Sequence, residues 1–137
     1  MSSAPFFSFL VEPDRDLVRI VVAGFFTPAD VAAFVKARNA AHAQLTCAPN
    51  QHVTLTDARE MKVQPQDAVA SFSDMLAAPE HCSRRLAFVV ASTLARSQLT
   101  RAAGSRTARF FTDEAKAEAW LFAAEQENPA QRTAAEA

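Results

Sequence analysis

The chain has 137 residues, of which 50% are hydrophobic and 21% are charged, and its formal net charge is −1. This length and balance fit a single globular domain whose core is large enough to fold alone. A nearly neutral chain has no global electrostatic drive toward nucleic acid or an anionic membrane surface. No apolar run approaches the roughly 20 residues that cross a bilayer, and the first residues do not resemble a secretory signal.

The cysteine and glycine contents narrow the class of protein further. The two cysteines, Cys47 and Cys82, lack the spacing of a disulfide framework, so we expect reduced thiols and a cytoplasmic protein. The only two glycines are Gly24 and Gly104. A glycine-rich phosphate loop needs several glycines because its backbone approaches the phosphate closely. Dinucleotide-binding and P-loop nucleotide sites are therefore not expected.

The first half of the chain predicts a hairpin and a helix. Strands over residues 6–11 and 17–23 flank a turn-like segment and suggest an antiparallel pair. Thr27 can cap a helix that has Pro28 in its first position and Asp30 where the helix dipole favours negative charge. The apolar stripe of this helix consists of Val31, Phe34, Val35, Ala41 and Leu45.

The second half alternates strands and helices. We expect a strand over 52–57, a helix from Gln64-Pro65 to Pro79 and a strand over 85–91. A helix over 94–103, ended by Gly104, and a strand over 108–111 should follow. Residues 112–114 should cap a last helix, whose inward residues are Ala117, Trp120, Leu121 and Ala124. In the strand over 52–57, Val53 and Leu55 share one face and Thr54 and Thr56 the other, as in a half-buried strand.

The resulting order, ββαβαβαβα, predicts an α/β fold. An N-terminal antiparallel hairpin should continue into a mostly parallel sheet with right-handed crossovers. The polar face of the third strand suggests that helices cover mainly one face of the sheet. A half-covered face is a natural place for two copies to form a homodimer. We expect one domain over residues 1–127 and a flexible tail over 128–137.

Four phrases of the sequence carry a family resemblance: Val22–Asp30, Val53–Arg59, Arg85–Val90, and Phe110–Ala115 together with Ala119–Leu121. They resemble the SpoIIAA-like branch of the STAS fold, the relatives of anti-sigma-factor antagonists and Sec14-type lipid-binding domains. The resemblance covers nearly the whole chain, and its motifs mark strand ends, helix caps and core positions. It implies a regulatory or protein-interaction module, and the Sec14-type relatives imply a small-molecule or lipid carrier as the alternative.

One segment departs from this family. In anti-sigma-factor antagonists, the loop after the third strand carries an Asp-Ser pair whose serine is phosphorylated. The corresponding residues here, 61–66, contain no hydroxyl group, and Ser71 and Ser73 lie further along the helix. The resemblance therefore implies a module without the usual phosphoserine switch.

Candidate binding residues follow the third strand. Ligands of open α/β sheets lie beyond the carboxyl ends of the strands, where Asp57, Arg59 and Glu60 are expected, together with Thr93. The alternative is that Asp57 and Arg59 tie the loop down and that the threonine caps a helix.

The same edge of the sheet can form a pocket for a small anionic molecule. Phe25 and Phe26 would line it with Met61, and Arg59 or Arg101 would receive the anionic head group.

Arginines concentrate in the second half of the chain. Between His81 and Thr112 there are no acidic residues and six arginines, namely Arg84, Arg85, Arg96, Arg101, Arg106 and Arg109. Arg96 and Arg101 flank the outward face of the third helix and can form a basic patch for an acidic partner. The alternative is an ordinary solvated face. Nucleic acid is not expected as a partner, because the aromatic residues interleaved with these arginines are only Phe110 and Phe111.

The sequence does not predict catalysis. His42, Cys47 and His52 are five residues apart, whereas zinc sites bring paired ligands at short spacing, so no metal or other cofactor is expected. No Ser-His-Asp, Cys-His or paired-carboxylate arrangement is recognisable. The chain is therefore predicted to bind a protein partner or a second copy of itself. The alternative is a carrier or sensor of an anionic small molecule.

Overall fold

The computed structural model describes residues 4–91, 93–104 and 108–123. Its elements are β1 (Phe6–Glu12), the 3-10 turn η1 (Pro13–Arg15), β2 (Leu17–Gly24), α1 (Pro28–His42), β3 (Val53–Met61), α2 (Gln66–Ala77), the 3-10 turn η2 (Pro79–His81), β4 (Arg85–Val89), α3 (Thr93–Ala103) and β5 (Ala108–Phe111). A further helix covers residues 114–123 and is called the 114–123 helix. The predicted order ββαβαβαβα is confirmed, and the predicted tail over 128–137 lies outside the described residues.

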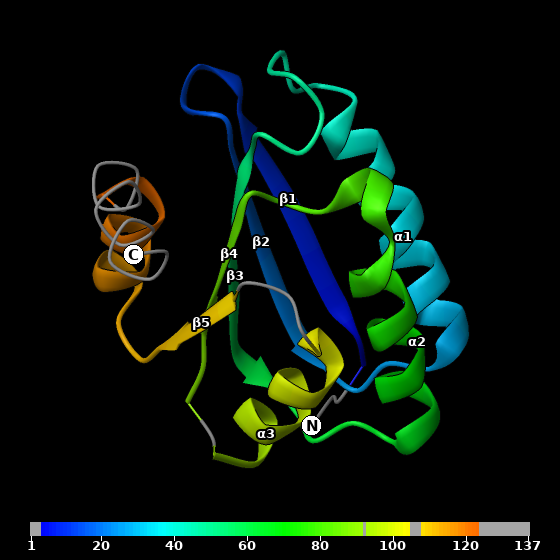
Figure 1. Cartoon of the computed structure of the whole chain (residues 1–137). Coiled ribbons are helices and arrows are strands. Elements are labelled where there is room, and N and C mark those ends of the chain that lie inside the picture. Colours follow the sequence, from blue (N-terminus) through cyan, green and yellow to red (C-terminus); the bar gives the residue numbers. More distant parts are fainter. Residues whose placement is uncertain (1–3, 92, 105–107, 124–137) are drawn as a thin grey trace, which may run out of the picture.

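The five strands form one sheet in the order β1-β2-β3-β4-β5 (Figure 1). β1 and β2 are antiparallel, and all other neighbours are parallel. The predicted hairpin that continues into a mostly parallel sheet is therefore confirmed.

Local sequence signals explain where α1 and α3 begin and end. Thr27 and Asp30 form a reciprocal capping box: Asp30 N–H donates to Thr27 Oγ1 over 3.1 Å, and Thr27 N–H donates to Asp30 Oδ2 over 2.9 Å. Pro28 occupies the first turn of α1 as predicted. Gly104 follows α3 with φ +61°, the left-handed conformation that ends helices.

The third strand is longer than the sequence indicated. It continues to Met61, because its last residues pair with Ala23 and Gly24 after a register shift in β2. The charged residues Arg59 and Glu60 interrupt the apolar alternation and so hide this extension from the sequence pattern.

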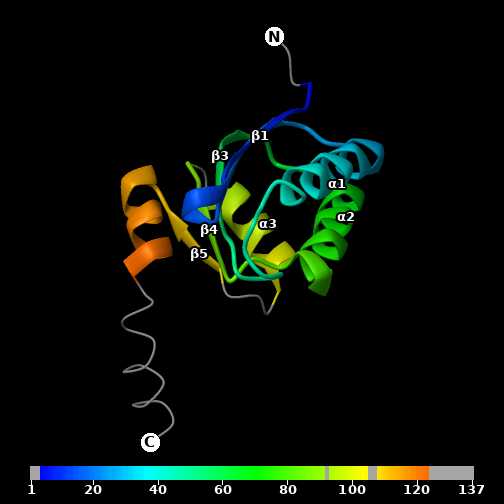
Figure 2. The same cartoon turned by 90° about the horizontal axis from the view of Figure 1, so that it is seen from above.

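Helices cover the two faces of the sheet unequally, as predicted. α1, α2 and α3 lie on one face, and the 114–123 helix lies on the other (Figure 2). The larger core, under the three helices, contains a cluster of Phe7, Phe9, Phe26, Phe34 and Phe72, whose ring centroids are 5.0–6.5 Å apart.

The polar face of β3 is buried. Thr54 and Thr56 are only 5% and 6% exposed, and they share a face with Ile20, Leu86 and Phe88 beneath the three helices. Polar residues on this strand therefore mark the more covered face of the sheet. Their hydroxyls line a partly open cavity, and the sequence alternation alone could not distinguish that environment from solvent.

The 114–123 helix is attached to the sheet by apolar contacts. Its fully buried Ala117 and Leu121 pack against a second core formed by Leu17, Val53, Leu55, Ala87 and Val89. Trp120 lies beneath the guanidinium of Arg85, which is 4.8 Å from the ring centroid. The sequence prediction of an inward Ala117 and Leu121 is confirmed, and Ala124 lies outside the described residues.

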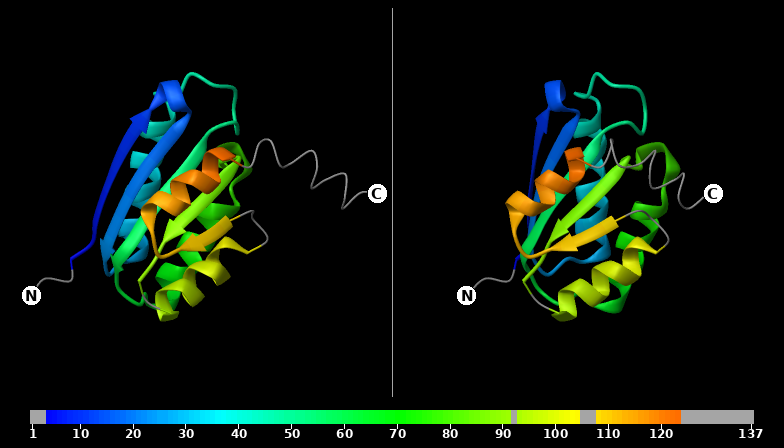
Figure 3. Two further views of the ribbon diagram at one scale, coloured as in Figure 1. Left: turned by 90° about the vertical axis from the view of Figure 1, so that its left-hand side faces the viewer. Right: turned by 60° about the vertical axis from the view of Figure 1, so that its left-hand side comes forward.

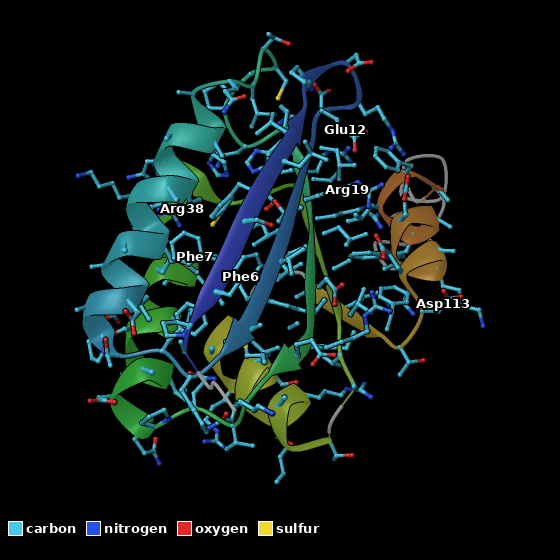
Figure 4. The ribbon with its side chains drawn as sticks, turned by 180° about the vertical axis from the view of Figure 1, so that it is seen from behind. Phe6, Phe7, Glu12, Arg19, Arg38 and Asp113 are labelled. Atoms are coloured by element: carbon cyan, nitrogen blue, oxygen red, sulfur yellow. The ribbon has the colours of Figure 1, made fainter. Side chains whose placement is uncertain are left out.

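Ion pairs join this helix to the hairpin, and Figure 4 labels Glu12 and Arg19 of the hairpin. Arg19 contacts Glu12 at 2.8 Å, Glu114 at 3.0 Å and Glu118 at 2.7 Å. Arg15 contacts Glu12 at 3.0 Å and also pairs with Glu118. We call these five residues the Arg19 cluster. Hydrogen bonds from Arg19 and then Arg15 lower the pKa of Glu12, and those from Arg15 and then Arg19 lower the pKa of Glu118.

A buried amide joins the segments at the carboxyl edge of the sheet. Gln64 is 6% exposed. Its Oε1 accepts from Phe26 N–H over 2.7 Å, and its Nε2 donates to the carbonyl of Gly24 over 2.8 Å. Its backbone N–H donates to Gln98 Oε1 over 2.7 Å, and its carbonyl accepts from Gln98 Nε2 over 2.8 Å. Gln64 thus connects the end of β2, the β3–α2 loop and α3.

Replacing Gln64 tests this connection. Gln64→Ala removes the acceptor of the buried Phe26 N–H, whereas the Gly24 carbonyl still accepts from Lys62 N–H over 3.2 Å. We therefore expect the free energy of unfolding to fall by about 1–3 kcal/mol. Urea denaturation measures the change. Gln66→Ala, at an exposed position at the start of α2, is the matched control and should change stability little. Equal stability of the two variants would contradict the proposed role.

The contribution of the Arg19 cluster to stability should depend on salt. Arg19→Met keeps the aliphatic stem but removes three ion pairs, so we expect a loss of about 1–2 kcal/mol at low salt. The loss should shrink in about 1 M salt, because screening weakens the wild-type pairs. Urea denaturation of the wild type and of Arg19→Met at both salt concentrations measures this loss, and Arg101→Met, at an exposed position, is the control. A loss that does not depend on salt would show that Arg19 contributes through packing instead.

Candidate functional site

A partly open cavity of about 60 Å³ lies between the sheet and the helices α1, α2 and α3. Most of its wall is apolar: Ile20, Val22, Phe34, Met61, Phe72, Met75, Leu76, Leu86, Phe88 and Leu99. The polar part of the wall consists of Arg38, His42, Thr54, Thr56, His81 and Ser83. The cavity therefore has an apolar body and one polar side, an arrangement typical of sites for small ligands.

Arg38 brings a positive charge to this wall. It lies on the inner face of α1 and is 8% exposed (Figure 4). Its Nη1 donates to the carbonyl of Met75 over 3.3 Å, and its Nε and Nη2 donate to Asn39 Oδ1 over 3.3 and 3.2 Å. These bonds hold the guanidinium between α1 and the end of α2.

The three histidines of the chain gather beside Arg38. His42 Nδ1 and His81 Nδ1 are 3.0 Å apart, and the ring centroids of His42 and His52 are 4.4 Å apart. One of the two Nδ1 atoms must carry a proton and the other must accept it. Burial, followed by the charges of His52, His81 and Arg38, lowers the pKa of His42 to about 3. His42 is therefore neutral at physiological pH.

A second, more open pocket of about 200 Å³ adjoins the histidines. His42 and His81 line both spaces, and Cys47, Asn50 and His52 line only the outer one. Asn50 Nδ2 donates to the carbonyls of Pro79 and Cys82 over 3.0 and 2.8 Å, which fixes the loop after α1 against the segment before β4. Thr54 and Ser83 hydroxyls share a 2.7 Å hydrogen bond beside the inner cavity.

Among the residues that the structure describes, no group of three or more histidine, cysteine, aspartate or glutamate side chains could hold an ion. In the same residues, no helix is both long enough and apolar enough to span a membrane.

The predicted residues after the third strand face away from the cavity. Arg59 donates to Asp57 over 2.9 and 2.7 Å and also contacts Glu114 at 3.4 Å, next to the 114–123 helix. The hydrogen bond from Arg59 lowers the pKa of Asp57. Glu60 is exposed beside this pair. These contacts correspond to the alternative of a tied-down strand end.

The other predicted residues do not join them in one site. Thr93, Arg96 and Arg101 are exposed on α3. Phe25 is 43% exposed, whereas Phe26 is 1% exposed inside the aromatic cluster, so Phe26 belongs to the core.

The arginines likewise occupy separate surfaces. Arg96 lies over the Phe110 ring at 5.6 Å, whereas Arg85 and Arg109 contact Trp120 on the opposite face of the sheet. Arg106 lies outside the described residues. The acid-free segment therefore does not present its described arginines as one patch.

The sequence analysis did not name Arg38, and it considered His42 and His52 only as metal ligands. The available signal was a break in the predicted apolar stripe of α1: Arg38 and His42 share the helix face of Val31, Phe34 and Ala41. A charged residue and an imidazole on a buried face indicate either a structural polar contact or a site. The convergence of His52 and His81 on them depends on tertiary packing.

Comparisons with known proteins were made on sequence and on structure. No protein-family model and no curated protein sequence matches the chain. An uncharacterized protein of the DUF3478 family with a SpoIIAA-like fold, from Shewanella loihica, matches with a TM-score of 0.65 and 20% identity, covering 88% of this chain and 98% of that one. An anti-sigma factor antagonist from Mycobacterium paratuberculosis matches with a TM-score of 0.54 and 12% identity, covering 85% and 94%.

Both similarities extend over most of either chain, and they agree with the strand order and the mixed sheet described above. The sequence resemblance is thereby confirmed at the level of the fold, and the chain has a SpoIIAA-like fold.

Proposed function

We propose that the chain is a non-catalytic regulatory module of the STAS/SpoIIAA type that binds a small molecule in the cavity beneath α1 and α2. The observation that carries the proposal is the polar wall around buried Arg38 in an otherwise apolar cavity. The similarity to an anti-sigma factor antagonist supports a regulatory role exercised by binding. The two free cysteines support a cytoplasmic location.

The shape of the cavity indicates the class of ligand. A volume of about 60 Å³ accommodates a short apolar group, and the adjoining pocket offers room for more. The charge of Arg38 favours a negative end, and the hydroxyls of Thr54, Thr56 and Ser83 can bond to it. A small carboxylic acid with a short apolar body has this chemistry.

This placement differs from the one expected from the sequence. Arg38, His42 and His81 lie toward the amino end of β3, because α1 runs back across the sheet and ends near His52. At the carboxyl edge, Gln64 closes the loops with its own hydrogen bonds. The anionic ligand is therefore proposed at the opposite end of the strands from Asp57, Arg59 and Arg101.

The module is proposed to act without the usual phosphoserine. Residues 61–66 carry no hydroxyl, and the buried side chain in this loop is the neutral amide of Gln64. Regulation would then depend on occupancy of the cavity.

Ligand binding can be tested with a defined set of probes. Freshly purified protein is compared by native and denaturing mass spectrometry, and then titrated calorimetrically with straight-chain carboxylates of increasing length and the matching alcohols. We expect carboxylates to bind with an optimal length, and alcohols of the same length to bind more weakly. Absence of binding by the whole series, together with an adduct-free native mass, would refute the proposal.

Two variants assign the binding to the cavity. Arg38→Met should weaken carboxylate binding at least about tenfold, since a hydrogen bond to a charged group contributes about 1.5–3 kcal/mol. Leu99→Phe should shorten the longest chain accepted, because it fills the apolar end. Exposed Arg101→Met is the control and should bind as the wild type does. Unfolding curves of each variant show that the fold is retained.

The histidines predict a pH dependence of stability. Between about pH 6.5 and pH 3, the unfolded chain protonates His42 and the folded chain does not, because the pKa in the fold is lowered to about 3. Stability is therefore fully present above pH 6.5 and falls as the pH decreases through this interval. His42→Asn should show a shallower fall in the urea midpoint between pH 7 and pH 5. Parallel curves would contradict this assignment.

A further inference from the structure

We propose that two copies of this chain associate by antiparallel pairing of β1, so that their sheets join into one. The proposal concerns the edge of the sheet and is independent of the ligand cavity. β1 is the first strand in the order β1-β2-β3-β4-β5, so within the described part of the chain only one of its sides is paired. The left view of Figure 3 shows β1 at the outer margin of the sheet.

β1 lacks the features that protect edge strands from pairing. It is seven residues long, and its only charged residue, Glu12, is at its end and is held in the Arg19 cluster. It contains no proline and no lysine. Monomeric proteins commonly protect an edge with an inward charge, a proline, a bulge or a very short strand. The free backbone groups of β1 are therefore available to another strand.

Exposed apolar side chains accompany this open edge. Phe6 is 53% exposed and Leu10 is 57% exposed on the face away from α1 (Figure 4 labels Phe6). Val21, 38% exposed, lies beside them on β2. The 114–123 helix packs on Leu55, Ala87 and their neighbours and does not cover this part of the sheet. On the other face, Phe7 and Phe9 pack only partly into the core.

The order of residues in β1 indicates a second copy as the occupant. Phe6 and Phe7 precede Ser8, and Phe9 and Leu10 follow it, so the strand is nearly symmetric about Ser8. An antiparallel pair centred on Ser8 places Phe6 opposite Leu10 of the second copy and Phe7 opposite Phe9 of the second copy. Such aromatic and aliphatic cross-strand pairs stabilise a sheet.

The same register avoids repulsion between like charges. With the pair centred on Ser8, Glu12 lies opposite Ala4 of the second copy and not opposite the other Glu12. Each side chain stays on the face that it already occupies, because the side-chain period of a strand is two. A single pair of strands gives a small interface, so the association should depend on concentration.

Sedimentation velocity over a wide range of protein concentrations tests the association. The wild type should shift from monomer to dimer, and Leu10→Lys should remain monomeric because it places a charge on the open edge. Leu94→Lys is the matched control: Leu94 is an exposed leucine, 65% accessible, on α3. It should dimerise as the wild type does. A wild type that stays monomeric at every concentration, or an equal effect of the two substitutions, would overturn the proposal.

Cross-linking tests the register. In a variant with Cys47→Ser and Cys82→Ser, Ser8→Cys brings two thiols face to face across the symmetry axis and should form a disulfide-linked dimer rapidly under mild oxidation. Phe6→Cys should react much more slowly, because its partner is Leu10 of the second copy. Mixing Phe6→Cys with Leu10→Cys should restore rapid cross-linking. Equal rates for all three would overturn the register.

Discussion

The central strands of this protein bury both of their faces, and this constraint determines the rest of the fold. In β2 and β4, successive residues such as Leu17 and Val18, or Phe88 and Val89, are buried in different cores. A strand of this kind requires cover on both sides. Three helices supply it on one side, and the single 114–123 helix supplies it on the other. Because one helix covers only part of a sheet face, the hairpin half of that face stays open.

β3 also buries both of its faces, but one of them carries threonines, and these residues line the cavity. Thr54 and Thr56 stand where β2 and β4 carry larger apolar side chains, including Ile20 and Phe88. Small hydroxyl residues leave space in the larger core and provide polar atoms beside it. Arg38 and the histidines then enter from α1 and η2. One face of β3 thus lines the polar cavity with Thr54 and Thr56, and its other face contributes Val53 and Leu55 to the apolar second core.

The sequence predicted the architecture well because strand alternation, caps and turns are local signals. The cap at Thr27, Gly104 after the third helix and the strand Ala108–Phe111 were all correctly placed. The site was not predicted, because the residues of its polar wall are separated by as many as 45 positions, from Arg38 to Ser83. The burial of Thr54 was also not evident, since alternation gives two faces without saying what covers each. Gln64 was recognised only as part of a helix start, and its role depends on contacts with Gly24, Phe26 and Gln98.

The joint made by Gln64 consists entirely of neutral groups, whereas the 114–123 helix is held in part by carboxylates and guanidinium groups. Neutral hydrogen bonds do not respond to protons or to dissolved ions, but paired carboxylates do. High salt therefore weakens one attachment and leaves the other intact. The ion-paired side of the 114–123 helix should loosen from the hairpin at high salt, while the buried contacts of Ala117 and Leu121 and the bonds of Gln64 persist.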